Sequence, residues 1–188
     1  LAALDLVLLR FEMPEGVPGP EAIMELEAEG VKLVNVSLAG PYNKLLDQAM
    51  SQAQDRGLVV VAAGGNDGEA ADPLYPAAFE RAIAVTAVDA DGRVYRNAVR
   101  GAHVDIAAPG VDVRVTAQAA RFVTGTSIAA PFVTAKLAAD ARFAAQGGGE
   151  EARATIAASA QDLGPAGVDE TFGAGLLSAD GLCDPRLN

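Results

Sequence analysis

The sequence predicts an α/β domain built on a parallel β-sheet with helices on both faces. Short apolar runs alternate along the chain with segments that have the composition and periodicity of helices. Polar residues hardly interrupt these runs, as expected of strands that are buried on both faces of a sheet. With 188 residues, the chain is long enough for one such domain with a sizeable core.

The first half of the chain gives the clearest elements. An apolar run over 4–10 predicts a strand, and the proline and glycine content of 11–19 predicts a loop. A helix is expected from Pro20, because proline is favoured in a first helical turn, to about Glu29, with Gly30 as its stop. Further buried strands are expected over Val31–Ser37, Leu58–Ala63 and Ala82–Val88.

Three more helices follow from hydrophobic patterning. The segment 43–56 is amphipathic and ends at Gly57. Residues 128–144 are apolar almost all round, which predicts a helix inside the domain. A last helix is expected over 151–160. The buried face of the helix at 43–56 is expected to contain Leu45, Leu46, Ala49, Met50 and Ala53.

Composition excludes several classes of function. The formal net charge is −11, and the basic residues are scattered rather than gathered in a stripe, which argues against nucleic-acid binding. No apolar run reaches the length of a membrane span. The single cysteine, Cys183, excludes an intrachain disulfide, and no nearby histidine activates its thiol. Residues 1–10 do not have the pattern of a signal peptide, and the abrupt strand suggests a natural start further upstream.

The most informative segment is Gly-Thr-Ser-Ile-Ala-Ala-Pro at 125–131. Ser127 lies at the mouth of the expected buried helix, where free N–H groups and the helix dipole stabilise negative charge. Small neighbours leave room for a substrate backbone. On position alone, an ordinary helix-capping serine is the simpler interpretation.

A second candidate follows the strand at 58–63. The run Val-Val-Val-Ala-Ala-Gly-Gly-Asn-Asp-Gly at 59–68 places Asn66 between glycines at a strand end. A rigidly held asparagine side chain there can donate a hydrogen bond to an oxyanion. By itself, Gly-Asn-Asp-Gly is only a turn signal. Because the carboxyl ends of parallel strands meet at one edge, Asn66 and the segment after Ser37 are expected on the same side of the sheet.

Several segments, taken in order, resemble the catalytic domain of subtilisin-like serine proteases (subtilases). They are 34–41, 60–66, Tyr-Pro-Ala at 75–77, Ile-Ala-Val at 83–85, Asp-Ile-Ala-Ala-Pro-Gly at 105–110 and the Ser127 motif. The glycine-rich 172–177 resembles the closing segment of that domain. The resemblance covers about residues 4–180 and the C-terminal two-thirds of the domain. It implies a three-layer subtilisin-like sheet that lacks the N-terminal strands and helices, with 1–188 as a single partial domain.

The resemblance also implies roles for individual residues. Ser127 would be the nucleophile, and Asn66 would donate to the oxyanion together with the Ser127 N–H. The reaction would be hydrolysis of a peptide bond through an acyl-enzyme, on a peptide or protein substrate. Two segments would form the walls of the primary specificity pocket, with Pro76 and Ala77 near its base. These walls consist of Ser37, Leu38, Ala39 and Gly40 on one side and Ala62, Ala63 and Gly64 on the other.

The chain departs from the family pattern in several places. The family's triad aspartate and histidine precede the serine, and the segments that carry them lie upstream of anything matching Leu1. The one histidine, His103, stands where the family has no triad member, so we expect this chain alone to be inactive or nearly so. Phe132 replaces a histidine common after the proline. Ala39 replaces a frequent glycine, which favours smaller substrate side chains.

The missing upstream strand also affects the sheet. In subtilases the aspartate-bearing strand lies between those that resemble 4–10 and 32–37. Without it, these two strands must pair directly, leave a gap or be bridged by a second chain covering the exposed sheet.

No catalytic cofactor is implied, although some subtilases bind a weak structural cation such as calcium near 77–82 and Asp105. His103 stands where an acidic ligand can occur, which weakens the match to that site. Asp-Ala-Asp-Gly at 89–92 is better explained as a turn than as a calcium loop, because the later ligands are absent. Nucleotide binding and α/β-hydrolase esterase activity are disfavoured because their glycine motifs are incomplete.

The main alternative to a protease is a catalytically inactive pseudoprotease or peptide-binding module that holds an extended peptide by strand addition. The presence of both Ser127 and Asn66 argues against it, since a binding groove needs neither. By family resemblance, the protein is expected to be secreted or located in the cell envelope.

Overall fold

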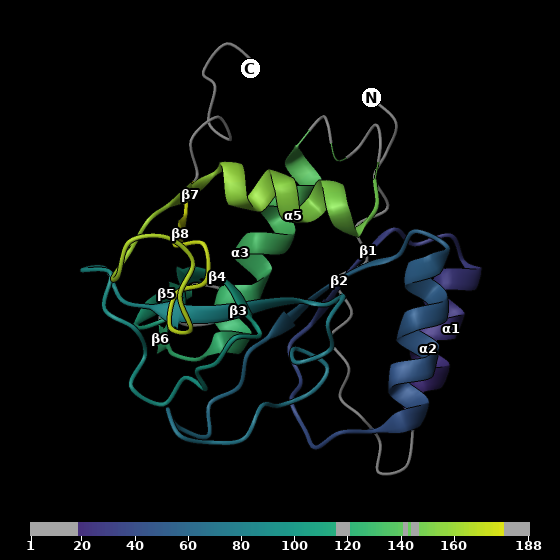
Figure 1. Ribbon diagram of the computed structural model, residues 1–188, viewed down its shortest axis with the longest axis horizontal. Helices are drawn as coiled ribbons and strands as arrows, with labels where there is room; N and C mark the ends of the chain where they lie inside the picture. The colour runs from purple at the N-terminus through teal and green to yellow at the C-terminus, as the bar shows by residue number, and fades with distance from the viewer. Residues whose placement is uncertain (1–18, 116–120, 141–142, 144–146, 179–188) are drawn as a thin grey trace.

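A computed structural model describes residues 19–115, 121–140, 143 and 147–178. Its main sheet has six strands in the order β1-β2-β3-β4-β8-β7, and only the β7–β8 pair is antiparallel (Figure 1). The predicted parallel α/β fold is therefore confirmed. The strands are β1 (Leu33–Val36), β2 (Val59–Ala63), β3 (Ile83–Val88), β4 (Val104–Pro109), β7 (Ala160–Gln161) and β8 (Leu176–Leu177).

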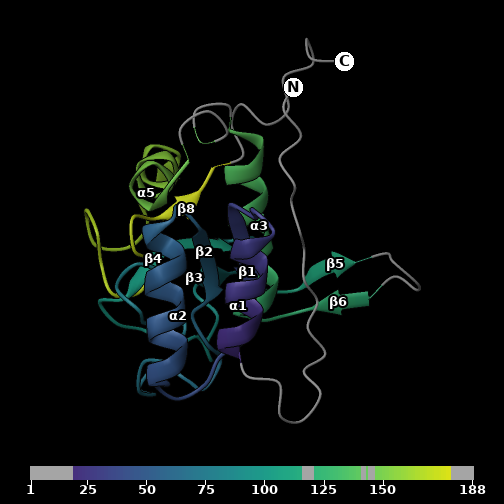
Figure 2. The ribbon, with the colours of Figure 1, turned by 90° about the vertical axis from the view of Figure 1, so that its right-hand side faces the viewer.

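Helices cover both faces of this sheet and give three layers. Helices α1 (Gly19–Ala28) and α2 (Lys44–Asp55) pack together on one face, where Val34 and Val60 point toward them. Helices α3 (Thr126–Ala139) and α5 (Gly149–Ala158) lie on the other face, against the alternate residues of the same strands. Figure 2 shows α1 and α2 together in front of the sheet, with α3 and α5 behind. The strands are buried on both faces because alternate residues belong to different cores.

Most predicted elements of the described region are confirmed, with small shifts at their ends. The helix α2 is capped by Asn43, whose Oδ1 accepts the N–H groups of Leu45 and Leu46 at 2.9 and 3.1 Å. The prediction that Leu45 lies on the buried face was wrong, because this side chain is 65% exposed. The predicted strand at 4–10 and Cys183 lie outside the described residues.

The internal helix starts earlier and ends earlier than predicted. Helix α3 begins at Thr126 and is capped at its C-terminus by Asp140, and residue 144 lies outside the described range. Pro131 therefore lies in the second turn of α3, whereas the helix expected from residue 128 would have placed it in the first turn.

A small antiparallel sheet between β4 and α3 was not predicted. Strands β5 (Val113–Val115) and β6 (Arg121–Val123) pair with each other and project from the body of the domain (Figure 2). Behind them, the Gly110 carbonyl accepts the N–H of Gly125 at 2.8 Å, which ties the start of α3 to the end of β4. A Cβ on Gly110 would lie 2.6 Å from Ala87 Cβ and 2.9 Å from Ala129 Cβ, so only glycine allows this approach.

Gly110→Ala is therefore expected to destabilise the chain by about 1–3 kcal/mol, because the added methyl group overpacks the contact between β4 and α3. Urea unfolding followed by circular dichroism measures the change. Gly149→Ala is the matched control, since a Cβ there meets nothing within 4 Å, and it should cost little or nothing. Equal losses in the two variants would contradict the packing argument.

Candidate active site

The carboxyl ends of two parallel strands and the first turn of α3 meet at one edge of the sheet. Ser37 follows β1, Asn66 follows β2, and Ser127 is the second residue of α3. Hydrogen bonds join the three segments: Ser37 Oγ donates to the Ser127 carbonyl at 3.1 Å, and the Thr126 N–H donates to Asn66 Oδ1 at 3.0 Å. The structure thus places Ser37 and Asn66 at one edge, as the sequence predicted, and adds Ser127 to them through these contacts.

The Asn66 side chain is oriented by Thr126. Its Oδ1 accepts both the Thr126 N–H and the Thr126 hydroxyl, the latter at 3.2 Å. The same hydroxyl, which is fully buried, accepts the N–H of Gly65 at 3.1 Å. Because the oxygen of the amide is held in this way, its Nδ2 group must point away from Thr126. Among the described residues, we find no acceptor for Asn66 Nδ2.

Gly125 leaves an open space between Asn66 and Ser127. A Cβ on Gly125 would lie 3.2 Å from Ser127 Oγ and 3.6 Å from Asn66 Nδ2, so both groups border the same small volume. The φ angle of Gly125 is +152°, a conformation that favours glycine. The N–H of Ser127 belongs to the first turn of α3, where the helix itself supplies no acceptor. Ser127 Oγ and the Asn66 amide, whose Oδ1 would lie 3.7 Å from the same Cβ, therefore come close together at Gly125. Asn66 Nδ2 and the Ser127 N–H are groups of the kind that can donate to a developing negative charge.

The backbone of Ser127 is fixed by a contact that the sequence analysis missed. In a regular helix its carbonyl would accept the N–H of residue 131, but this residue is a proline and has no N–H. The Ser37 hydroxyl takes that place at 3.1 Å. Ser37 is in turn held by Asn35 Nδ2 at 2.9 Å, and Asn35 Oδ1 accepts the buried hydroxyl of Thr134 at 3.1 Å.

A chain of polar side chains therefore links the middle of α3, the end of β1 and the carbonyl of Ser127. The proline in the motif was visible in the sequence, and its missing N–H is the signal that could have predicted a substitute donor. Which residue supplies that donor could not be read from the sequence.

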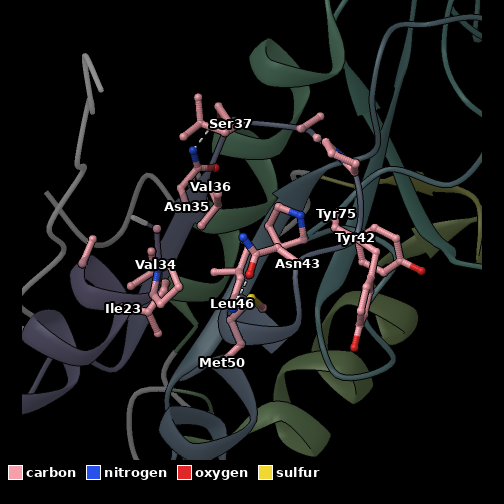
Figure 3. Close-up of a pocket in the computed structure, with 18 residues that line it drawn as sticks. Ile23, Val34, Asn35, Val36, Ser37, Tyr42, Asn43, Leu46, Met50 and Tyr75 are labelled. Carbon is pink, nitrogen blue, oxygen red and sulfur yellow. Dashed lines mark hydrogen bonds between the residues drawn. The ribbon is translucent and has the colours of Figure 1, made fainter. Parts of the chain in front are cut away.

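The predicted substrate-binding residues fall into two groups in the structure. Ser37, Leu38, Ala39 and Gly40 line a cavity of about 460 Å³ between α1, α2 and the end of β1, together with Pro76 (Figure 3). Gly40 is anchored by paired backbone hydrogen bonds with Tyr75 of 2.9 and 2.8 Å. The other predicted wall is not part of this cavity. It consists of Ala62, Ala63 and Gly64, which are buried at the end of β2.

His103 lies at the opposite edge of the sheet from Ser127. It precedes β4, whose six residues separate it from the edge where α3 begins, a span of roughly 20 Å at the rise of an extended strand. Burial lowers the pKa of His103, and the nearby Asp105 carboxylate only partly offsets this shift. A general base must lie within hydrogen-bond reach of the nucleophile, so His103 cannot act on Ser127 in this fold.

The acidic turn at 89–92 is held by its own hydrogen bonds. Asp89 Oδ1 accepts the N–H groups of Asp91 and Arg93, both at 2.9 Å, and the Arg93 side chain pairs with Asp91. These contacts are those of an Asx-type turn. Within the described part of the chain, no group of three or more acidic, histidine or cysteine side chains is arranged to hold a metal ion. No described helix has the length and apolar character needed to cross a membrane.

The three-layer arrangement of a mostly parallel sheet is shared with subtilisin-related structures. The sequence matches the subtilase family of peptidases (peptidase family S8) over residues 19–175, and the chain belongs to this family.

Relatives of known identity agree with this assignment. The chain is 32% identical over 153 residues to the minor extracellular protease Epr of Bacillus subtilis strain 168, over 80% of this chain and 24% of that protein. It is 34% identical over 154 residues to subtilisin BL of Lederbergia lenta, over 80% of this chain and 56% of that protein. Fervidolysin from Fervidobacterium pennivorans, a keratinolytic enzyme related to subtilisin, superposes with a TM-score of 0.76 at 26% identity, over 86% of this chain and 28% of that structure. The chain thus spans from about a quarter to just over half of these relatives' length.

Ser37→Ala is expected to destabilise the chain by about 1–3 kcal/mol, because it leaves the Ser127 carbonyl without a donor. In a Pro131→Ala background the same substitution should cost less, since the N–H of an alanine at 131 can bond that carbonyl. Urea unfolding of the four variants of this double-mutant cycle measures the coupling. An identical cost of Ser37→Ala in both backgrounds would contradict the proposed link between Ser37 and Pro131.

Proposed function

We propose that this chain carries half of the active site of a serine endopeptidase, with Ser127 as nucleophile and Asn66 as oxyanion donor. The observation that supports this most directly is the common space beside Gly125, bordered by Ser127 Oγ and Asn66 Nδ2. Thr126 holds the amide of Asn66 in the required orientation. Membership of the subtilase family supports the same conclusion.

In this mechanism Ser127 Oγ attacks the carbonyl carbon of a peptide bond. The new C–O bond converts the carbonyl oxygen into an oxyanion, which accepts hydrogen bonds from Asn66 Nδ2 and the Ser127 N–H. The base that took the Ser127 proton would return it to the nitrogen as the C–N bond breaks and the amine leaves. Water then attacks the acyl-enzyme, giving one proton to the base, which passes it to Ser127 Oγ as the acid is released. Because both donors are fixed by the fold before the reaction, they need no reorganisation as charge develops.

The general base is not supplied by this chain. A serine hydroxyl is a weak nucleophile until a base removes its proton, and His103 lies at the wrong edge of the sheet. We therefore propose that the triad aspartate and histidine come from residues outside this sequence, and that the 188-residue chain alone has little or no activity.

The proposed substrate is an extended peptide at the carboxyl edge of the sheet. Ser37 to Gly40 would pair with its backbone and form one wall of the pocket for the side chain before the cleaved bond, while Ala62 to Gly64 would form the other. The methyl group of Ala39 would narrow the edge of this pocket and favour substrates with smaller side chains.

Location and a further strand of the sheet are also proposals. We propose that the protein is secreted, since a relative that matches 80% of this chain is named an extracellular protease. Within the described sheet, β1 pairs only with β2, and we propose that a further strand pairs with its other side. That strand, from this protein or from a second chain, stays a prediction.

The nucleophile is tested by an active-site probe. A fluorescent phosphonofluoridate should label the natural full-length protein at Ser127, as located by mass spectrometry, and should not label Ser127→Ala. The isolated chain should react far more slowly because it lacks the base. Failure of the full-length protein to react would favour the alternative of an inactive peptide-binding module.

The oxyanion donor is tested by Asn66→Ala in the full-length protein. The expected loss in kcat is about 10²- to 10³-fold with little change in KM, a range known from the corresponding experiment on subtilisin, which belongs to this family. Peptide hydrolysis kinetics measure it. Asn97→Ala is the control, because the exposed side chain of Asn97 bonds to Tyr95, and its backbone bond to Gly68 is kept in the variant. If kcat is unchanged and kcat/KM falls only because KM rises, a transition-state role for Asn66 is contradicted.

A further inference from the structure

A cluster of oxygen atoms at the amino-terminal edge of the sheet converges on one guanidinium group. Asp105, near the start of β4, offers Oδ1, and the loop before β3 offers the carbonyls of Glu80 and Ala82. Arg153 of α5 donates to all three, with 2.8 Å to the Glu80 carbonyl. The second carboxylate oxygen, Oδ2, accepts the Ala84 N–H at 2.7 Å, which fixes Asp105 against the sheet.

This set of ligands is of the kind that hard metal cations prefer. One carboxylate and two backbone carbonyls are typical ligands of calcium and of alkali-metal ions. The site is also reachable, since the side chains of Arg153 and Asp105 are 35% and 21% exposed. A hydrated ion could therefore enter if the oxygens were free, with water completing its coordination.

The residues present do not fit a metal ion at this site, because its oxygens are already engaged by a fixed positive charge. A metal ion on these oxygens would lie within a few ångströms of the guanidinium in a partly buried setting, where repulsion between the charges is strong. The planar guanidinium has five N–H donors in a rigid arrangement. It can contact a carboxylate and two carbonyls at once, which the ammonium group of a lysine, acting as a point charge, does less well.

We propose that Arg153 acts as a built-in cation, in place of the weak structural cation that the family resemblance leaves room for near 77–82 and Asp105. The guanidinium clamps α5 to the loop before β3 and to β4. Two consequences follow. The chain with Arg153 gains no stability from a metal ion at this site, and removal of the guanidinium opens a cation-binding site. Neither consequence depends on the proposed protease activity, since the cluster lies at the edge opposite Ser127.

The test is the thermal unfolding midpoint of the full chain with added CaCl₂ or KCl, against tetramethylammonium chloride at matched ionic strength. Asp105→Asn reports the non-specific effect of these ions on a chain with a net charge of −11. In the unaltered chain, calcium or potassium should raise the unfolding midpoint no more than it does in Asp105→Asn. Arg153→Ala should lower the midpoint by about 4–8 °C and should regain part of this loss with calcium, potassium or millimolar guanidinium ion. Arg153→Ala/Asp105→Asn should not recover.

Arg81→Ala is the matched control for loss of a positive charge. Arg81 lies in the same loop but pairs with Asp55 and the Ser51 carbonyl, so its loss should create no response to cations. A cation-specific rise in the chain with Arg153 that Asp105→Asn abolishes would overturn the proposal. So would an Arg153→Ala variant that recovers with none of the three ions. If Arg153→Ala does not fold, calorimetric titration of calcium into the unaltered chain and into Asp105→Asn decides the same question. A binding heat that is present in the unaltered chain and absent in Asp105→Asn would reveal an open metal site and overturn the proposal.

Discussion

The hydrogen bonds between Thr126 and the Asn66 side chain are the constraint on which the proposed site depends. They join two segments that are 60 residues apart in sequence, the end of β2 and the start of α3. Thr126 is fully buried, and its hydroxyl also accepts the N–H of Gly65. The position of Asn66 is therefore set by its own side chain and by the backbone of the preceding residue. An oxyanion donor is effective only if it is held in place before charge develops, and this contact holds it.

Contacts between distant segments also fix the first turns of α3. Pro131 removes one helical hydrogen bond, and the Ser37 hydroxyl replaces it from the end of β1. Gly110 and Gly125 carry no side chain at the points where β4, α3 and Asn66 come closest. These residues thus have separate roles. The two glycines allow close approach of the backbone, and Pro131 leaves the Ser127 carbonyl free to accept the Ser37 hydroxyl.

Sequence reasoning predicted the parallel sheet, its helices and the edge shared by Ser37 and Asn66, because these follow from local patterns and from the rule that the carboxyl ends of parallel strands share one edge. The pairing of Ser127 with Asn66 was implied by the family resemblance alone. It did not predict β5 and β6, whose three-residue strands carry too little pattern. It placed Leu45 on the buried face of α2 although this residue is mostly exposed, since periodicity does not locate the edge of a face. The contacts of Ser37, Asn35 and Arg153 were also missed, because each joins residues distant in the sequence and no local signal identifies the partner.

The central claim is that Ser127 and Asn66 form two parts of one acyl-transfer site. A crystal structure of the natural full-length protein, phosphonylated at its reactive serine, tests it directly. The account predicts a phosphorus–oxygen bond at Ser127 Oγ, with the phosphoryl oxygen about 2.7–3.1 Å from both Asn66 Nδ2 and the Ser127 nitrogen. A phosphoryl oxygen that points away from Asn66, or a phosphonate attached to another serine, would contradict it.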